Sequence, residues 1–311
     1  MYFFHPPHKL KQWVPLEKLN WIGISENING MRLLTQNQDK IVWSWLSQNP
    51  NAIEFIESNQ DKIVWYYLCA NLNPNVIDIL MKNVDRIEWD VLSCNPNAIE
   101  LLTAHPNNID WYNLSMNSGA IELLEGNPSK INWEMLSLNT GAIEILKKNE
   151  DKIDWYFLAE NECAVSIIES VDMTIKWPLD MDCNHKYIYG FLSKNPNAIH
   201  IIENNISSVS WSALSKNKNA IHILNMYPEK IHWPNISLNP SAIDILEKNQ
   251  DKIDWFNLSS NPSIFEIDYE FLQNRIANYR EELSAVCYHP KRLKYFIDKY
   301  NYDIGDDSYF I

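Results

Sequence analysis

The sequence predicts an all-α fold, an α-solenoid of about eleven 22-residue helix–turn–helix repeats with atypical caps at both ends. Three observations predict it: a tryptophan that recurs at nearly constant spacing, an asparagine six residues after it, and apolar residues at helical spacing after that asparagine. Successive tryptophans are 22 residues apart, except for gaps of 24 after Trp65 and 34 after Trp177. These tryptophans are Trp21, Trp43, Trp65, Trp89, Trp111, Trp133, Trp155, Trp177, Trp211, Trp233 and Trp255. We write the unit as W-x-x-L-S-x-N-P-x-A-I-E-I-L-x-x-N-x-D-K-I-D and number its positions 1 to 22 from the tryptophan.

The chain divides into three predicted regions. Residues 1–20 form an irregular apolar N-terminal cap that we expect to cover the first repeat. Residues 21–268 form the repeat array, which carries an insertion at 178–189, and Tyr189 then stands where a tryptophan is expected. Residues 269–311 form a C-terminal helical cap, because terminal units of an array meet water on one face. In this cap the apolar spacing from Leu272 to Val286 predicts one longer helix, and His289-Pro290 forms the cap of another.

Positions 1 to 6 of the unit predict a short helix. Asp, Asn or Ser precedes the tryptophan in many copies and is a good N-cap. The tryptophan and the leucine lie three residues apart and therefore share one face. Position 5 holds only small residues, which indicates that two helices approach closely there. The N-cap candidates are Asp110, Asn132, Asp154, Ser210 and Asp254.

Positions 7 to 17 predict a second, amphipathic helix of about ten residues. The asparagine at position 7 occurs in every copy and is usually followed by proline, the pattern of an N-cap and a first helical residue. A second asparagine at position 17 is predicted to end the helix in the left-handed conformation. The position-7 residues are Asn27, Asn49, Asn71, Asn95, Asn117, Asn139, Asn161, Asn195, Asn217, Asn239 and Asn261. The position-17 residues include Asn37, Asn59, Asn83, Asn127, Asn149 and Asn249.

Stacking is the expected source of stability, since isolated helices of two to three turns are marginal in water. Each repeat is expected to bury its tryptophan, leucine and isoleucine against the next. With helices 8–10 Å apart, the stack is predicted to run to about 100 Å. A leucine-rich β-solenoid has units of similar length, but its LxxLxL alternation is missing, and the spacing after Asn-Pro is helical.

The recurring "NPNAIE-[IL]-L-x-x-N-x-DKIDW-x-x-LS" unit resembles tandem-repeat proteins that large double-stranded DNA viruses of the mimivirus kind carry in many copies. The closing "EELSAVCYHPKRLKYFI" is similar to the ending of those chains. The resemblance covers roughly residues 13–300 and departs from the pattern at the 178–189 insertion. The resemblance implies a viral origin and does not point to any particular activity.

Composition excludes several classes of function. The net charge of −14 opposes nucleic-acid binding, and no run of 18 apolar residues indicates a membrane span. The five scattered cysteines fit a reducing compartment, so we expect a cytoplasmic protein, in the host cell if viral, with a place in the virion as the alternative. Nucleotide-binding, hydrolase and zinc-protease motifs are missing, so we expect no enzyme activity and no cofactor. Cys183, His185 and His200 offer a metal site, but His200 falls at a solvated helix position, and we expect no metal.

The candidate binding residues are aromatic and lie at positions 2 and 3, which vary most between copies. Variable aromatic residues on a fixed scaffold are typical anchors for a protein partner, although some can instead pack between neighbouring helices. The candidates are Trp45, Tyr66, Tyr67, Tyr112, Tyr156, Phe157 and Phe256. The acidic residues at position 12 form a second stripe, which is either a binding surface for a basic segment of a partner or an ordinary solvent-exposed helix face.

Three hypotheses of function follow. The first is a non-catalytic scaffold that binds a protein partner along one face. The second is a structural or packaging component of a virion that self-associates. The third is an enzyme with a site at the 178–189 loop, since long loops on rigid arrays often carry function.

Overall fold

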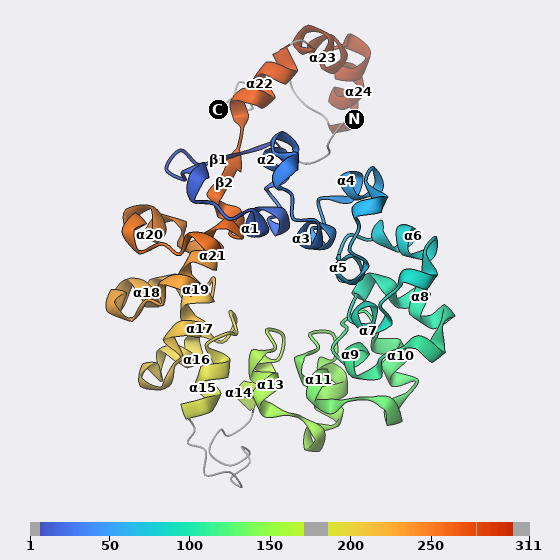
Figure 1. Ribbon diagram of the computed structural model, residues 1–311, viewed down its shortest axis with the longest axis vertical. Helices are drawn as coiled ribbons and strands as arrows, with labels where there is room; N and C mark the ends of the chain where they lie inside the picture. The colour runs from blue at the N-terminus through green and yellow to red at the C-terminus, as the bar shows by residue number, and fades with distance from the viewer. Residues whose placement is uncertain (1–6, 171–185, 278, 301–311) are drawn as a thin grey trace. The chain divides into compact units, whose positions relative to one another are not determined.

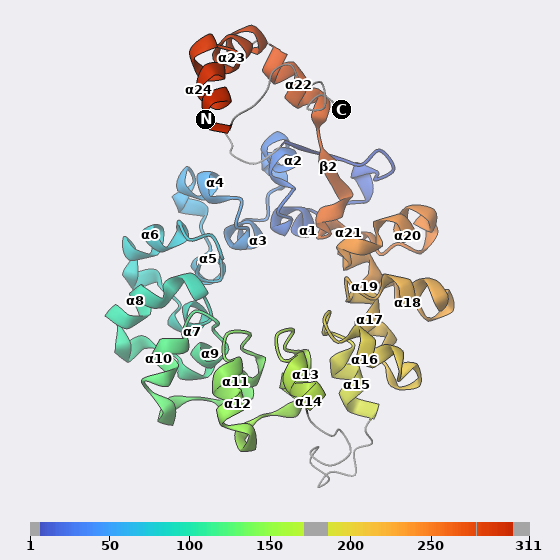
Figure 2. The ribbon, with the colours of Figure 1, turned by 180° about the vertical axis from the view of Figure 1, so that it is seen from behind.

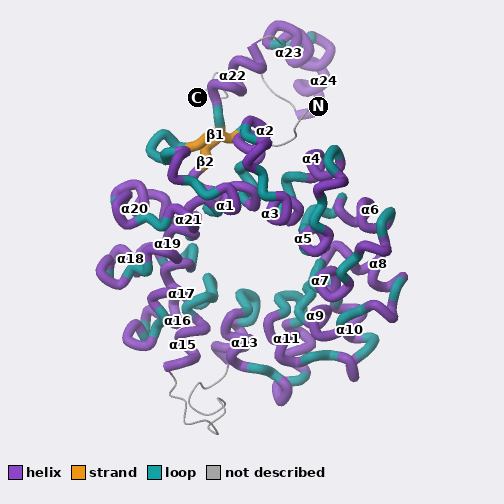
Figure 3. Tube along the Cα trace, in the orientation of Figure 1, coloured by secondary structure: helices purple, strands orange, loops and turns teal. Residues whose placement is uncertain are grey.

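The computed structural model describes residues 7–170, 186–277 and 279–300. It divides into two compact units, residues 10–265 and residues 1–9 with 266–311. The first unit contains all eleven repeats and is an α-solenoid in which each of the first ten repeats supplies one inner and one outer helix, whereas the eleventh supplies an inner helix only (Figure 1, Figure 3). Tyr189 does occupy the tryptophan slot of the eighth repeat, because the Ser193 hydroxyl donates to its carbonyl as the other serines donate to a tryptophan carbonyl.

Ten of the eleven inner helices begin at the tryptophan, whereas α15 begins at Lys186, and all are five to seven residues long. Their five expected N-caps are confirmed, since each of those side chains accepts a hydrogen bond from a backbone N–H of the first turn. The inner helices are α1 (Trp21–Glu26), α3 (Trp43–Gln48), α5 (Trp65–Cys69), α7 (Trp89–Ser93), α9 (Trp111–Ser115), α11 (Trp133–Leu138), α13 (Trp155–Glu160), α15 (Lys186–Leu192), α17 (Trp211–Lys216), α19 (Trp233–Leu238) and α21 (Trp255–Ser259).

The outer helices are shorter than the ten residues expected from the sequence, because a turn or a 3-10 helix separates the asparagine of position 7 from the first α-helical residue. The expected left-handed ending is wrong. Asn149 has φ −136°, and its side chain caps the helix by donating to the Ile145 carbonyl. The outer helices are α2 (Met31–Gln36), α4 (Ile53–Glu57), α6 (Val76–Met81), α8 (Ile99–Ala104), α10 (Ile121–Glu125), α12 (Ile143–Lys148), α14 (Val165–Ser170), α16 (Ile199–Glu203), α18 (Ile221–Met226) and α20 (Ile243–Lys248).

The asparagine at position 7 links every repeat to the one before it. Asn139 donates through Nδ2 to the carbonyl oxygens of Ser115 (3.0 Å) and Asn117 (2.8 Å), and its Oδ1 accepts the backbone N–H of Gly141 (2.9 Å). All eleven position-7 asparagines are buried and make the equivalent three bonds. We call this set the asparagine ladder. Its acceptors include carbonyls at the end of an inner helix, which have no partner within the helix.

The serine at position 5 makes a second link between inner helices. Ser137 donates to the Trp133 carbonyl (2.8 Å) and accepts the backbone N–H of Asp154, the N-cap of the next inner helix (3.0 Å). Where the slot holds serine, it does so because a hydroxyl both donates and accepts within a buried contact, whereas Cys69 and Ala159 meet only the requirement for a small side chain.

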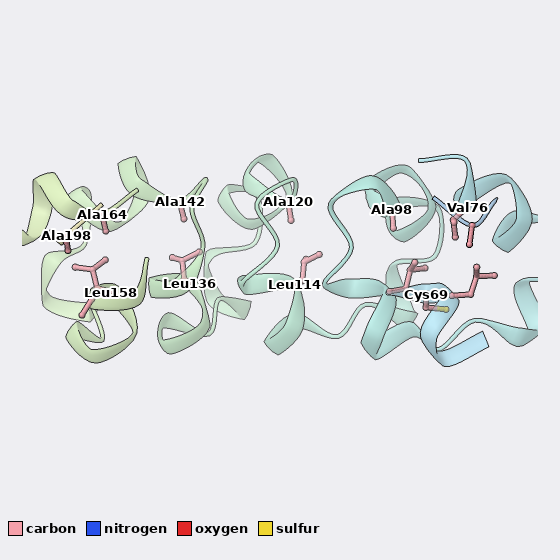
Figure 4. Packing of buried hydrophobic residues seen from close by; sticks show 14 of the residues in the cluster. Cys69, Val76, Ala98, Leu114, Ala120, Leu136, Ala142, Leu158, Ala164 and Ala198 are labelled. Carbon is pink, nitrogen blue, oxygen red and sulfur yellow. The ribbon is translucent and has the colours of Figure 1, made fainter. Parts of the chain in front are cut away.

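The core consists of two rows of aliphatic side chains between the helix layers. Figure 4 shows one row of leucines on the inner helices (Leu114, Leu136 and Leu158) facing a row of alanines that lead into the outer helices. The leucine of position 4 is fully buried in these repeats. The expectation that the tryptophans are fully buried is wrong for most copies, since Trp155 is buried but Trp133 is only partly covered.

In most repeats a cation from position 20 stacks on the exposed ring of the partly covered tryptophan. Lys152 Nζ lies 4.4 Å from the centroid of the Trp133 ring, and the same stacking recurs in other repeats. A cation over the face of an indole is attracted by the ring quadrupole. In these repeats the lysine or arginine of the turn therefore holds the outer part of the repeat to its inner helix.

The repeat unit of residues 10–265 closes on itself. Asn27 of the first repeat donates to the carbonyls of Ser259 and Asn261 in the eleventh repeat, both at 3.0 Å, so the asparagine ladder has no end. Helix α1 packs against α21 as α3 packs against α1 (Figure 1, Figure 2). The expected open stack of about 100 Å is therefore wrong. A small rotation at each interface, repeated eleven times, brings the last inner helix back to the first.

The eleventh repeat is assembled from both ends of the unit. Its inner helix is α21, but its 3-10 turn is η1 (Leu16–Lys18) from the N-terminal lead. Lys18 lies 4.7 Å from the ring centroid of Trp255, and the N–H of Asn20 donates to Ser259 Oγ at 2.8 Å, as positions 20 and 22 do elsewhere. The short strands β1 (His8–Leu10) and β2 (Phe265–Ile267) pair with each other. The N-terminal lead therefore completes the last repeat and joins it to the first.

The helices after the ring are largely exposed. The long helix expected over Leu272–Val286 is instead two helices, α22 (Tyr269–Ala277) and α23 (Arg280–Cys287). The last described helix, α24 (Pro290–Tyr300), begins at the expected His289-Pro290 pair, and the N–H of Lys291 donates to the His289 ring. Nine large hydrophobic side chains of this segment are exposed.

We expect Asn139→Ala to lower the free energy of unfolding by about 3–4 kcal/mol, because it removes three buried hydrogen bonds, those to the Ser115 and Asn117 carbonyls and that from the Gly141 N–H. The cap role expected from the sequence alone would cost only ~1 kcal/mol. Asn149→Ala is the matched control, since Asn149 donates one bond to the Ile145 carbonyl and otherwise accepts only a long, exposed bond from Lys152 Nζ, and ~1 kcal/mol is expected. Urea unfolding followed by circular dichroism measures both, and equal losses would contradict the ladder.

We expect Gly23→Ala to strain the junction between the first and eleventh repeats. A Cβ at Gly23 would lie 2.7 Å from Ser259 Cβ and 2.9 Å from the Ser260 backbone nitrogen, so about 2 kcal/mol should be lost. At Gly126 a Cβ meets nothing closer than 3.5 Å, so Gly126→Ala should be neutral or stabilise by about 0.5 kcal/mol. Thermal unfolding of the two variants decides, and an unaffected Gly23→Ala protein would mean that the ring is open in solution.

Candidate partner-binding surface

The inner helices turn one face away from the core, and this face carries the variable residues. Positions 4 and 5 are buried, and positions 2, 3 and 6 lie on the opposite side of a helix with 3.6 residues per turn. Because the outer helices cover the other side, this face lies on the inside of the ring (Figure 1). Aromatic residues fill eight of the twenty-two places at positions 2 and 3, against 12% of the whole chain.

The aromatic residues at position 2 are the exposed ones. Tyr66, Tyr112 and Phe256 are 53%, 51% and 57% exposed. Tyr156 occupies the same position but is half-buried, since its ring lies 5.4 Å from that of Phe191 in the next repeat. Position 2 therefore presents three large side chains to solvent from a fixed backbone.

The aromatic residues at position 3 pack toward the preceding repeat. Trp45 and Tyr67 are half-buried, with ring centroids 5.7 Å apart across two repeats. Phe157 is also half-buried. Where position 3 is asparagine, it makes a hydrogen bond in the same direction, as Asn113 does to the Asp90 carbonyl at 3.1 Å. Position 3 is thus partly structural.

The seven candidate residues do not form one patch. Trp45, Tyr66 and Tyr67 make one cluster, in which Tyr66 meets Tyr67 edge-on at 5.4 Å. Tyr156 forms a second pair with Phe191, a residue that the sequence reasoning missed. Phe191 could have been found from the sequence, because aligning the repeats after the insertion puts it at position 3 of the eighth repeat. No aromatic contact joins Tyr112 or Phe256 to another candidate within the described residues.

A groove that the sequence reasoning also missed runs along the ends of the inner helices. It has a volume of about 330 Å³ and is formed by positions 6 and 8 of four successive repeats, the eleventh, first, second and third. We call the surface made by positions 6 and 8 the inner rim. The lining residues of the groove are Glu26, Ile28, Gln48, Pro50, Ala70, Leu72, Ser260 and Pro262. Ile28 and Leu72 are both exposed.

The histidines and acidic residues of the outer helices lie away from this surface. Among the residues that the structure describes, no group of three or more His, Cys, Asp or Glu side chains is placed to hold a metal ion. His200 and His222 each pair with a glutamate of the preceding repeat, His200 with Glu169 at 2.7 Å. Cys183 and His185 lie outside the described residues. Most position-12 acidic residues are exposed on the outer helices, as Glu100 and Glu122 are.

The buried cysteines have the wrong chemistry for a nucleophile. Burial raises the pKa of the Cys69 thiol to about 11, against a smaller lowering by a hydrogen bond from the Glu88 backbone. Burial followed by the charges of Asp110 and Asp90 also raises the pKa of Cys94. The thiolate is the reactive form, so both thiols are held in their unreactive state near neutral pH.

Comparison of the chain with protein-family models, with curated proteins and with solved structures finds no match. None of the helices in the described part of the chain has the length and apolar character needed to cross a membrane.

We expect Cys69 to resist alkylation by iodoacetamide. With a pKa of about 11, only about one thousandth of this thiol is ionised at pH 8, and the side chain is fully buried. Cys163, which is exposed, serves as the internal control and should be labelled first. Mass spectrometry of time points measures both rates, and labelling of Cys69 as fast as Cys163 would contradict its burial.

Proposed function

We propose that this protein is a non-catalytic repeat scaffold that binds a protein partner on the inner face of its ring. The observation that carries the proposal is the exposure of Tyr66, Tyr112 and Phe256 at one structural position on rigid inner helices. A buried aromatic side chain contributes up to ~250 Å² to an interface, and aromatic residues dominate interface hot spots.

The asparagine ladder supports this proposal through the entropy of binding. The backbone that carries position 2 is fixed by position 4 in the core and by positions 5 and 7 in hydrogen bonds. A partner therefore orders a few side chains rather than a loop, which lowers the cost of association. The net charge of −14 favours a protein over a nucleic acid as the partner.

A second candidate function is self-association as a structural component, and the C-terminal helices favour it. Tyr269, Tyr279, Tyr288 and Tyr295 are each more than half exposed within α22–α24 and the link between α22 and α23. Exposed apolar surface of this density marks an interaction site. If the resemblance to viral repeat proteins holds, either function would be exercised in the host cytoplasm or in the virion. An enzyme site at the 178–189 loop falls mostly outside the described residues and is not proposed.

We expect the triple variant Tyr66→Ala, Tyr112→Ala and Phe256→Ala to lose the proteins that the unchanged chain captures from cells, at unchanged thermal stability, because exposed side chains add little to folding. The control is Met81→Ala with Met226→Ala, which removes two exposed side chains from outer helices. Capture that persists in the triple variant would contradict the proposal. Light scattering against concentration tests the second candidate, since a self-associating protein should grow in mass without any partner.

A further inference from the structure

Charge on the inner rim is concentrated in three neighbouring repeats. Going from the tenth repeat through the ring closure to the sixth, positions 6 and 8 carry one charged residue, Glu26. The seventh, eighth and ninth repeats carry the others, which are Glu160, Glu162, Lys194, Lys216 and Lys218. In a chain that is 21% charged, the other eight repeats, which carry Glu26 alone, form a distinct surface that we call the low-charge arc.

The low-charge arc contains the groove and is mostly apolar. Ile28, Leu72 and Met116 are exposed on it, and proline occupies position 8 in four of its repeats. Polar atoms in the groove come from Glu26, Gln48 and Ser260. The groove is therefore suited to an extended segment that brings apolar side chains and few charges.

The spacing of the repeats restricts the conformation of that segment. Packed helices lie about 8–10 Å apart, so the rim offers one apolar step per repeat at that distance. A polyproline II helix advances 3.1 Å per residue with three residues per turn, so one of its faces recurs about every 9.3 Å. A β-strand returns to the same face about every 6.7 Å and would fall out of register after two repeats.

The lysines at one end of the arc indicate that one end of the bound segment is acidic. Lys194 is already paired with Glu160 at 2.5 Å. Within the described residues, Lys216 and Lys218 of the ninth repeat are exposed and have no ion-pair partner. They stand two repeats before the groove, so acidic residues that meet them would lie about six residues from the apolar part of the segment.

We propose that the inner rim binds a polyproline II segment of about fifteen residues, with an apolar residue at every third place and an acidic cluster at one end. This inference rests on the proposed function and names the class of partner for the same inner face. The apolar part lies along the groove from the eleventh to the third repeat, and the acidic end meets Lys216 and Lys218.

Selection of a displayed library of random linear peptides of about fifteen residues on the immobilised full-length protein tests the inference. We expect the selected sequences to be rich in proline, with apolar residues three apart and acidic residues at one end. Selected peptides that are basic, or that have apolar residues two apart, would overturn the inference and leave the proposed function standing. If no peptide is selected and no protein is captured, both are overturned.

Variants then locate the binding of one selected peptide by fluorescence anisotropy. Leu72→Glu should weaken it at least ten-fold, and Lys216→Glu with Lys218→Glu should weaken it by a similar factor that shrinks at high salt. Met226→Glu and Lys248→Glu make the same chemical changes at exposed places on outer helices and should leave the affinity unchanged. Circular dichroism melts confirm that every variant is folded. Equal effects of the rim and control variants would refute the assignment to the rim.

Discussion

The fold depends on a buried amide at position 7 that has no alternative partner. Asn139 can satisfy its two Nδ2 hydrogens only if the preceding repeat places the Ser115 and Asn117 carbonyls at one distance and angle. A buried polar group without its bonds costs free energy, so the ladder fixes the relative position of successive repeats. Because Asn27 donates to the Ser259 and Asn261 carbonyls in the same way, the asparagine ladder makes the same contact at every junction of the circle. Closure also removes the exposed end faces that an open solenoid must cover.

Local structure was accessible from the sequence, but closure was not. The 22-residue period and the N-caps at Asp110 and Asp154 predict short paired helices, and these are present. Whether the stack closes depends on a small rotation per interface summed over eleven repeats. The sequence of a single repeat does not reveal the size of this rotation. One sign was available: "LEKLNW" before the first repeat matches "QDKIDW" before the last, as though a turn had been moved to the other end of the chain. The role of the position-7 asparagines was ambiguous for a similar reason. An asparagine side chain can cap its own helix or bond to the backbone of a neighbouring repeat, and the residue type does not distinguish the two.

The candidate site was only partly accessible, for a geometric reason. Positions 2 and 3 are adjacent in sequence but about 100° apart around a helix, so one points to solvent and the other to the preceding repeat. Aromatic residues occur at both, and sequence alone does not separate Tyr66, which is exposed, from Tyr67, which packs against Trp45. The inner rim was not predicted from the sequence, because its distinguishing feature is a low charge at residues that lie far apart along the chain. Ser260 and Ile28 share one groove only because the ring is closed.

The separation of fixed from variable positions has a consequence for how such a ring acquires a partner. Positions 4, 5 and 7 hold the backbone through burial and hydrogen bonds, whereas the side chains at positions 2, 6 and 8 change from repeat to repeat without altering those contacts. Substitutions at distant sites that share no partner act nearly independently on stability. The proposed binding surface can therefore change one repeat at a time while the scaffold keeps its geometry. Since each repeat offers a step of about 9 Å, the ligand we propose for this surface is a segment whose own period equals that step, rather than a folded domain.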